Sequence, residues 1–355
     1  MAPLIRELKN SKIEFKVAIT AQHREMLDQV LEFFEIKPDY DLDLMAPDQT
    51  LNGLSGKIIS QIDMVLEKEN PDLVVVQGDT TTAFIVSLAS FHKGIKVGHV
   101  EAGLRTYNSQ APFPEELNRQ MISKIAGLHF APTALAKSNL LKDLVPKELI
   151  HVTGNTVVDA LCWANEKFKR SSLKEEAAGI KNRLNNKKKL ILVTGHRREN
   201  FGQGMEHICK ALLQLAQEEN VEIVYPVHLN PNVLEPVKKI LDNNKNIHLV
   251  SPVSYPTMLW LMQICDIIIS DSGGVQEEAP TFNKPVLVTR MFTERAEGIK
   301  QGFSILVGTD KEKIILEAKK LLNHPPNLAL LENPYGDGTA AKRIVEIILS
   351  REHDV

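Results

Sequence analysis

The sequence is poor in the features that mark disulfide-rich, metal-binding or dinucleotide-binding proteins. Among its 355 residues only three are cysteines, Cys162, Cys209 and Cys265, and no CxxC pair occurs. An odd number of widely spaced thiols offers neither a disulfide framework nor a zinc site. The chain also has no Walker A sequence, no GxGxxG and no His/Asp cluster with metal-ligand spacing. We therefore expect no cofactor, no metal and a reducing compartment.

Long hydrophobic runs and an excess of one charge are absent as well. The stretch 259–269 is interrupted by Gln263 and Asp266 and falls short of a membrane span. The opening residues MAPLIRELKN lack the apolar segment of a signal peptide. Lys and Arg number 42 against 45 Asp and Glu, a formal net charge of −3, so no basic footprint is expected. These features predict a cytoplasmic protein that binds neither nucleic acid nor membrane.

Short runs rich in Val and Ile alternate with amphipathic stretches of helical length. The expected strands are 15–19, 72–77, 96–100, 149–152, 190–194, 222–226, 247–250, 267–270 and 285–288. The expected helices include 22–34, 52–68, 83–92, 204–218, 232–243, 311–321 and 340–349. Such alternation is typical of βαβ units, in which helices cover both faces of a parallel sheet.

A charged stretch without strand patterning, 165–188, separates two series of these elements, and the second series starts with KLILVTG. We predict an α/β fold of two doubly wound Rossmann-like domains, 1–168 and 169–338, that face each other across a cleft. The last segment, 339–355, is expected to pack back on the first domain. Because the chain opens on a helix, the strand that usually begins such a domain is expected to be missing.

Two acidic residues follow consecutive apolar strands. Asp79 comes after DLVVV, and Glu101 comes after KVGHV, one strand–helix–strand unit later. If these strands are neighbours, they lie about 5 Å apart, and both carboxylates project from the same rim. Paired carboxylates in a partly dry cleft can divide into an acid and a base. The alternatives are that Asp79 only caps the next helix and that Glu101 is a solvated loop residue.

A third acidic cluster begins a helix. Two prolines lead into Glu115 and Glu116, and carboxylates in a first turn complement the helix dipole, which suffices to explain one of them. Arg119 lies one turn from Glu115, so a simple ion pair between them is the alternative to a role in binding.

Two polar segments follow strands of the second half. His196 stands beside Arg197 and Arg198 at the end of KLILVT, where a histidine could donate to a phosphate. After IIIS, the segment Ser272-Gly273-Gly274 opens a helix, and bare backbone amides there suit a diphosphate. Glu278 follows about one turn later and could accept hydrogen bonds from ribose hydroxyls. Alone, a Ser-Gly-Gly turn is a weak signal, and a tight turn without a ligand is the alternative.

Taken together, these segments resemble the bacterial non-hydrolysing UDP-N-acetylglucosamine 2-epimerases along nearly the whole chain. The segments that carry the resemblance are TAQHREMLDQVL, QGDTTTAF, VGHVEAGLRT, PFPEELNRQ, VTGHRRENFG, YPVHLNPNV, SDSGGVQEEAP, Thr293–Arg295 and NPYGDG. The resemblance implies a glycosyltransferase-B-like fold, a cytoplasmic homodimer, a role in polysaccharide biosynthesis, and reversible conversion of UDP-N-acetylglucosamine to UDP-N-acetylmannosamine. The implied route eliminates UDP and adds it back to a 2-acetamidoglucal intermediate.

The resemblance also implies roles for individual residues. It implies catalytic roles for Asp79, Glu101, Glu115 and His196. It implies substrate binding by Arg119, His228, Ser272, Gly273, Gly274, Glu278 and Arg295. It implies that Gln22 and His23 border a second, allosteric UDP-N-acetylglucosamine site, as in some bacterial members.

The chain departs from the family pattern in three places. The family's N-terminal strand and its Gly-Thr-Arg-Pro-Glu loop are expected to be missing ahead of the first helix. Met291 and Phe292 replace a polar pair, and Met258 stands where an aromatic residue is common. Two alternatives to the reversible epimerase therefore stay open. One is a hydrolysing epimerase that releases UDP and N-acetylmannosamine, and the other is a non-catalytic UDP-sugar binder.

Overall fold

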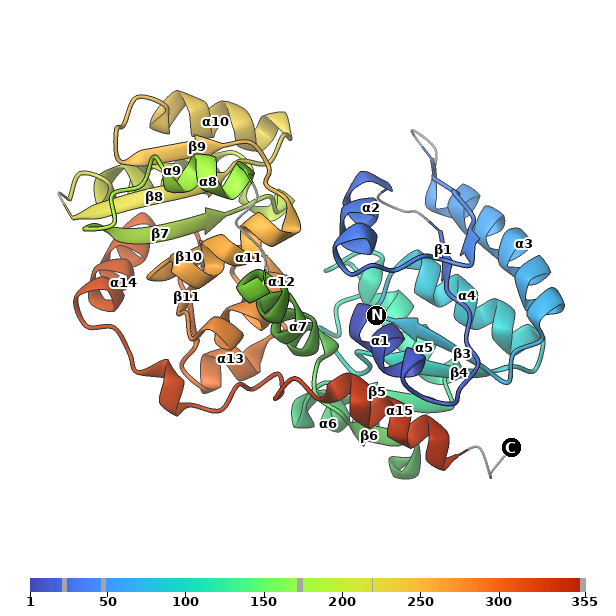
Figure 1. The fold of residues 1–355 in the computed structure, drawn as a ribbon. Helices are drawn as coiled ribbons and strands as arrows, with labels where there is room; N and C mark the ends of the chain where they lie inside the picture. The colour runs from blue at the N-terminus through green and yellow to red at the C-terminus, as the bar shows by residue number, and fades with distance from the viewer. Residues whose placement is uncertain (21–23, 46–48, 171–174, 219, 352–355) are drawn as a thin grey trace. The chain divides into compact units, whose positions relative to one another are not determined.

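The computed structural model describes residues 1–20, 24–45, 49–170, 175–218 and 220–351 (Figure 1). The chain divides into two compact units. The first comprises Met1–Ala160 and Tyr335–Val355, and the second comprises Leu161–Pro334. The chain leaves the first unit within α7 (Thr156–Arg170) and returns to it just before the last helix.

The first unit is built on a parallel sheet with the strand order β3-β4-β5-β6. Its strands are β3 (Leu73–Gln77), β4 (Lys96–Val100), β5 (Leu128–Ala131) and β6 (Ile150–Val152). A separate parallel pair joins β1 (Ala18–Ile19) to β2 (Tyr40–Asp41). The helices are α1 (Ala2–Lys9), α2 (Arg24–Phe33), α3 (Leu51–Glu69), α4 (Thr81–His92), α5 (Glu115–Ile125), α6 (Ala134–Lys142), the 3-10 turn η1 (Lys147–Leu149) and α15 (Ala340–Ser350).

Local signals set where the helices of this unit begin. Thr50, Thr80 and Thr133 precede α3, α4 and α6, and each threonine hydroxyl accepts the amide three residues ahead. The last helix is fixed by a remote residue, since the Asp159 carboxylate accepts the amides of Ala340 and Ala341 at 3.2 and 2.8 Å. Figure 1 shows α15, in red, beside the dark blue α1.

The second unit carries a parallel sheet with the strand order β12-β11-β10-β7-β8-β9. Its strands are β7 (Lys189–Thr194), β8 (Val221–Pro226), β9 (Ile247–Val250), β10 (Ile267–Ser270), β11 (Val286–Val288) and β12 (Ser304–Leu306). Its helices are α8 (Glu175–Lys181), α9 (Gln203–Leu215), α10 (Pro231–Leu241), α11 (Tyr255–Ile264), α12 (Gly273–Glu278), α13 (Ala296–Lys300), α14 (Lys311–Asn323) and the 3-10 turns η2 (Arg198–Asn200), η3 (Ala279–Phe282) and η4 (Leu328–Leu330).

The strands of the second sheet are apolar because both faces are covered. Ile191 and Val193 belong to a core cluster that α9, α10 and α14 share, while the intervening Leu192 points to the other face and is also fully buried. Continuous Val/Ile runs are what a parallel sheet between two helical layers requires. This sheet confirms the predicted α/β class with parallel strands.

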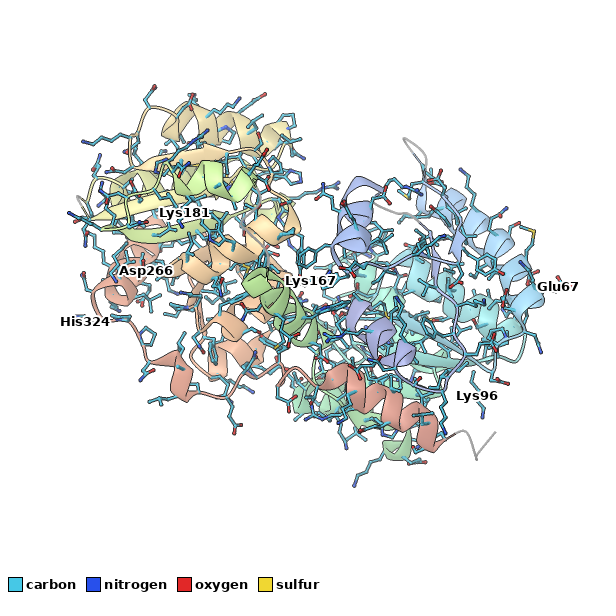
Figure 2. All side chains as sticks on the ribbon, in the orientation of Figure 1. Glu67, Lys96, Lys167, Lys181, Asp266 and His324 are labelled. Atoms are coloured by element: carbon cyan, nitrogen blue, oxygen red, sulfur yellow. The ribbon has the colours of Figure 1, made fainter. Side chains whose placement is uncertain are left out.

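The order of the second sheet places a switch point between β7 and β10. From β7 the chain proceeds to β8 and β9 on one side, and from β10 it proceeds to β11 and β12 on the other. The loops that follow β7 and β10 therefore diverge, and ligands of open α/β sheets bind at such a crevice. The opposite rim is tied by Asp266, labelled in Figure 2, which accepts the amide of Leu190 at 2.8 Å and the Lys189 ammonium at 3.0 Å.

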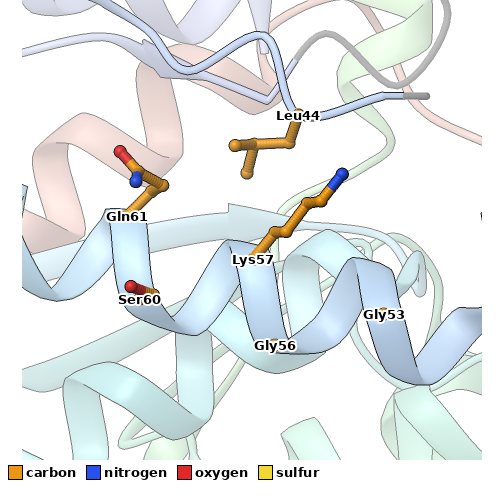
Figure 3. A pocket seen from close by; sticks show the side chains of 6 residues that line it. All are labelled: Leu44, Gly53, Gly56, Lys57, Ser60 and Gln61. Atoms are coloured by element: carbon orange, nitrogen blue, oxygen red, sulfur yellow. The ribbon is translucent and has the colours of Figure 1, made fainter.

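A pocket lies on the first unit beside α3. Its volume is about 550 Å³, and α3 provides most of its wall, with Leu44 opposite (Figure 3). Its lining residues are Leu44, Gly53, Gly56, Lys57, Ser60 and Gln61. In the described part of the chain, no helix has the length and apolar character needed to cross a membrane.

Candidate active site

The carboxyl ends of β3 and β4 bring two of the predicted carboxylates to one rim. The strands pair in parallel, with Gln77 opposite Val100, which confirms that they are neighbours. The residue directly after each strand has a left-handed backbone: Gly78 (φ 72°) after β3 and Glu101 (φ 66°) after β4. The Gln77 side-chain amide donates to Glu101 Oε2 at 3.3 Å. The non-glycine Glu101 is held in a conformation that costs free energy, a feature that clusters at functional sites.

Asp79 is oriented by residues from two other elements. Its Oδ2 lies 2.7 Å from the Arg119 guanidinium, and its carbonyl accepts the Asn118 side-chain amide at 2.9 Å. The next helix is capped by Thr80, whose hydroxyl accepts the Ala83 amide, so the alternative that Asp79 is merely the helix cap is wrong. The Asp79 side chain keeps 24% exposure and can be reached by a ligand.

The helix that begins at Glu115 supplies both of those partners. Its second residue, Glu116, is fully buried and accepts the backbone amides of Thr106 and Tyr107 at 2.9 and 3.0 Å. Arg119 lies between Glu116, at 3.4 Å, and Asp79, so it pairs with these two carboxylates rather than with Glu115. Glu116 thus fixes the preceding loop, and Glu115 begins the helix, half-buried.

His99 supports the same rim from inside the sheet. It is fully buried on β4, and its Nε2 lies 2.8 Å from the carbonyl of Gly78, so Nε2 donates. Burial lowers the pKa of His99 to about 3, although the hydrogen bond to Gly78 opposes this effect. A neutral histidine therefore holds the backbone immediately before Asp79.

In the second unit, the predicted residues follow four strands of one sheet. His196 follows β7, His228 follows β8, Ser272 follows β10, and Arg295 comes after β11. The rings of His196 and His228 stack, with centroids 5.7 Å apart and planes inclined by 22°. Burial lowers the pKa of His196, and the charges of Arg197 and His228 lower it further, while Asp271 raises it.

The Ser-Gly-Gly turn opens a helix, as the sequence predicts. Ser272 is the N-cap of α12, and its hydroxyl accepts the Val275 amide at 3.5 Å. The Arg295 guanidinium lies against Gly273, where an added Cβ would be 2.7 Å from its Cζ. Glu277 accepts the Arg295 Nε–H at 2.9 Å, and Glu294 also pairs with this arginine. An arginine thus stands directly over the turn.

Glu278 ends α12 and is half-buried. Burial, and secondarily the charge of Glu277, raises the pKa of Glu278 to about 8. A carboxyl group that keeps its proton at neutral pH can both donate and accept a hydrogen bond. That capacity suits a sugar hydroxyl.

The loop after β11 contains the apolar pair that departs from the family pattern. Met291 and Phe292 are 67% and 81% exposed. Arg290, just before them, pairs with Glu199 at 3.1 Å and with Glu294 at 3.0 Å, so the base of the loop is tied.

Sequence reasoning assigned no role to three residues that the structure places in the site. Asp271, His99 and Asn118 are buried and bond directly to the segments that carry His196 and Asp79. The sequence feature that could have pointed to Asp271 and His99 is a polar residue directly after an apolar strand or inside one. The predicted pair Gln22 and His23 lies outside the described residues. Across the described ranges, no group of His, Cys, Asp or Glu side chains is arranged to hold a metal ion.

Comparison with known proteins identifies the family. The family model described as UDP-N-acetylglucosamine 2-epimerase matches residues 6–349. This chain belongs to the UDP-N-acetylglucosamine 2-epimerase family. The Salmonella typhimurium UDP-N-acetylglucosamine 2-epimerase is 50% identical over 356 residues, which span 99% of this chain and 95% of the relative. The predicted family and enzyme class, an isomerase, are confirmed.

Solved structures agree with this family. The Neisseria meningitidis UDP-GlcNAc 2-epimerase bound to UDP-GlcNAc has a TM-score of 0.93 and 48% identity, covering 99% of this chain and 96% of its own. The Methanocaldococcus jannaschii enzyme in complex with UDP-GlcNAc and UDP has a TM-score of 0.84 and 34% identity, covering 98% and 95%. These structures confirm the predicted glycosyltransferase-B-like α/β fold class.

Proposed function

We propose that this chain reversibly inverts C2 of UDP-N-acetylglucosamine to give UDP-N-acetylmannosamine, without net hydrolysis. Family membership supports the reaction, and relatives of this family are described as bound to UDP-GlcNAc and UDP. The observation that carries the proposal is the rim of the first sheet, where Asp79 and Glu101 follow paired strands and Arg119 orients Asp79.

The chemistry requires proton transfer at C2. A carboxylate of the set Asp79, Glu101 and Glu115 removes the C2 proton, and the electron pair of that bond becomes the C1=C2 double bond. The C1–O bond breaks, and UDP leaves with its electron pair. UDP then adds back to C1 of the 2-acetamidoglucal, while another carboxyl group of the set protonates C2 from the opposite face. Two proton-transfer groups are needed because inversion uses both faces.

The second unit suits the nucleotide. The backbone amides of Gly273 and Gly274 and the Arg295 guanidinium are donors for the diphosphate. Ser272 caps the same turn, and the protonated Glu278 suits the ribose hydroxyls. His196, stacked on His228, stabilises the charge that develops on the departing UDP. Arg119 in the first unit is proposed to contact the substrate as well as Asp79.

The proposal includes further properties implied by the family resemblance. We propose a cytoplasmic homodimer that supplies polysaccharide biosynthesis, with Gln22 and His23 bordering a second, activating UDP-N-acetylglucosamine site. Two buried thiols, Cys209 and Cys265, suit a reducing compartment. Light scattering at several protein concentrations tests the dimer, and substrate-velocity curves of Gln22→Ala test the activation.

The reaction is tested by incubating the protein with UDP-N-acetylglucosamine in D2O and following the sugar by proton NMR. The expected product is UDP-N-acetylmannosamine with deuterium at C2. Glu101→Gln and Asp79→Asn should abolish deuterium incorporation, whereas Glu67→Gln, on the exposed face of α3, should match the unmodified enzyme (Figure 2). Free UDP together with N-acetylmannosamine would assign the chain to the hydrolysing class. An unchanged spectrum from folded protein would overturn the epimerase proposal.

A further inference from the structure

A buried carboxylate stands at the switch point of the second sheet. Asp271 directly follows β10, and its side chain is fully buried. Its Oδ2 accepts the backbone amides of His196 and Arg197 at 3.0 and 2.9 Å and the side-chain amide of Asn200 at 3.1 Å. Its Oδ1 lies 3.6 Å from the His196 ring Nδ1. One carboxylate therefore accepts hydrogen bonds from the backbone at His196 and lies at ion-pair distance from the His196 ring.

The direction of the His196 ring follows from this contact. Because Nδ1 faces the carboxylate, Nε2 is the ring nitrogen that is available to a ligand, and the His196 side chain is 46% exposed. The backbone beside it has little freedom, since a Cβ added at Gly195 would lie 3.3 Å from the Tyr225 hydroxyl and 3.6 Å from Asp271 Oδ2. The Asn200 side-chain amide also donates to the Thr289 carbonyl at 3.0 Å, which ties the loop after β7 to the end of β11.

We propose that Asp271 is the positioning residue of His196: it keeps a proton on Nδ1 and directs Nε2 toward the diphosphate of the substrate. The inference rests on the proposed epimerase function. As the C1–O bond breaks, negative charge accumulates on the leaving UDP, and an imidazolium can donate its Nε2–H to that oxygen. Asp271 faces Nδ1–H and stabilises the imidazolium, as in other carboxylate–histidine pairs.

The groups around His196 differ in how they affect its protonation. Three charged or titratable groups face the ring: Asp271 from the β10 loop, Arg197 from its own loop, and His228 from the β8 loop. Burial, Arg197 and His228 all disfavour the imidazolium, and only Asp271 favours it. Removing the charge of Asp271 therefore takes away the one interaction that favours the imidazolium, and the pKa of His196 is expected to fall further.

The same unit offers a matched control. Glu222, on β8, lies 3.6 Å from the Nε2 of His248 and accepts the Asn185 amide at 2.8 Å. The distance from carboxylate to imidazole equals that of Asp271 and His196. Glu222 is the second residue of its strand, so it lies near the amino end, away from the proposed site. Glu222→Gln removes an equivalent buried charge without touching the site.

The experiment compares Asp271→Asn with Glu222→Gln in the full chain labelled with 15N-histidine. Long-range proton–nitrogen NMR reports the tautomer and pKa of each ring, and His196→Asn assigns the His196 signals. Steady-state epimerisation is measured across pH on the same proteins. In unmodified protein the neutral His196 should carry its proton on Nδ1. In Asp271→Asn its pKa should fall by about 1 unit.

If Asp271 positions His196, its replacement should change kcat more than KM. In Asp271→Asn, kcat should fall by about 10- to 100-fold, the range found for partners that orient metal-binding histidines. KM should change by less than about 3-fold, because a substrate contact is retained and a transition-state interaction is lost. The alkaline limb of kcat should move to lower pH together with the His196 pKa. Glu222→Gln should retain the kcat, the pH profile and the His196 signals.

Each outcome of these measurements either supports the proposal or overturns it. An Nε2–H tautomer in the unmodified protein overturns the proposal even if Asp271→Asn fails to fold. A loss of kcat without a shift of the pH profile or of the His196 pKa also overturns it, since that pattern indicates a structural role only. If the unmodified enzyme does not epimerise UDP-N-acetylglucosamine, the proposed function fails. The tautomer and titration then still decide whether Asp271 controls His196.

Discussion

Replacing Arg119 by methionine removes the only positive charge between Asp79 and Glu116 in the described network. The arginine side chain is 5% exposed and Glu116 is fully buried, so the change leaves two carboxylates without their shared cation. Breaking a buried pair costs about 3–5 kcal/mol. Asp79 is 24% exposed and can be rehydrated, and Glu116 keeps two backbone amides, so the expected loss is smaller.

We expect Arg119→Met to lower the free energy of unfolding by about 2–3 kcal/mol. In a unit of this size, each kcal/mol shifts the melting temperature by about 2–4 °C. Urea denaturation of Arg119→Met, Asp79→Asn and the double variant gives the coupling energy between the two residues, which should exceed about 0.5 kcal/mol. Strict additivity, or an Arg119→Met protein as stable as the unmodified one, would refute the pairing. Arg119→Lys is the control that retains the charge but loses the second contact.

Three further changes test other parts of the structure. Gly273→Ala places a Cβ 2.7 Å from Arg295 Cζ, so the guanidinium must move, and calorimetry should show UDP binding weakened about 10-fold or more. Glu278 has a folded-state pKa of about 8, raised from 4.5, so its contribution to stability is present below pH 4.5 and is lost as pH rises through 8. Glu278→Gln should therefore flatten the decline of the melting temperature between pH 5 and 8. Ile344→Ala empties a fully buried position of the core that α15 shares with α1, and denaturation should show a loss of about 2–5 kcal/mol.

Much of the second sheet could be predicted from its sequence. The expected strands 247–250 and 267–270 coincide with β9 and β10. Prediction succeeds here because strands buried on both faces must be continuous apolar runs with clear boundaries. The first unit is less regular. The expected strand 15–19 is reduced to β1, whose pairing with β2 forms a separate small sheet.

One strand of the first sheet escaped the sequence prediction. Only four residues, Leu128–Ala131, form β5, and buried His129 interrupts their apolar pattern. Burial lowers the pKa of His129 to about 4, so the ring behaves as a neutral side chain inside the sheet. From the sequence alone, a buried neutral histidine inside a strand cannot be told apart from a solvent-exposed histidine that marks the end of a strand.

Site residues that directly follow strands could be predicted from the sequence. Residues that act through contacts with distant parts of the chain could not. Asp79 and Glu101 follow neighbouring strands, so topology alone places them on one rim. The contact between Asp271 and His196 joins residues 75 positions apart in the chain, and no spacing rule connects them. The contact forms because β10 lies beside β7 in the sheet, and this strand order is seen only in the structure.

The two units therefore support the proposed reaction in different ways. In the first unit, a neutral histidine and an amide fix the backbone around Asp79, and one guanidinium is shared by two carboxylates. In the second unit, a buried carboxylate directs a histidine, and two glutamates hold an arginine over the turn at Gly273. Proton transfer at C2 needs carboxylates that are fixed in place, whereas expulsion of UDP needs cationic donors that are fixed in place. In each unit the functional side chain is fixed by a buried partner of opposite charge: Arg119 beside Asp79 in the first unit, and Asp271 beside His196 in the second.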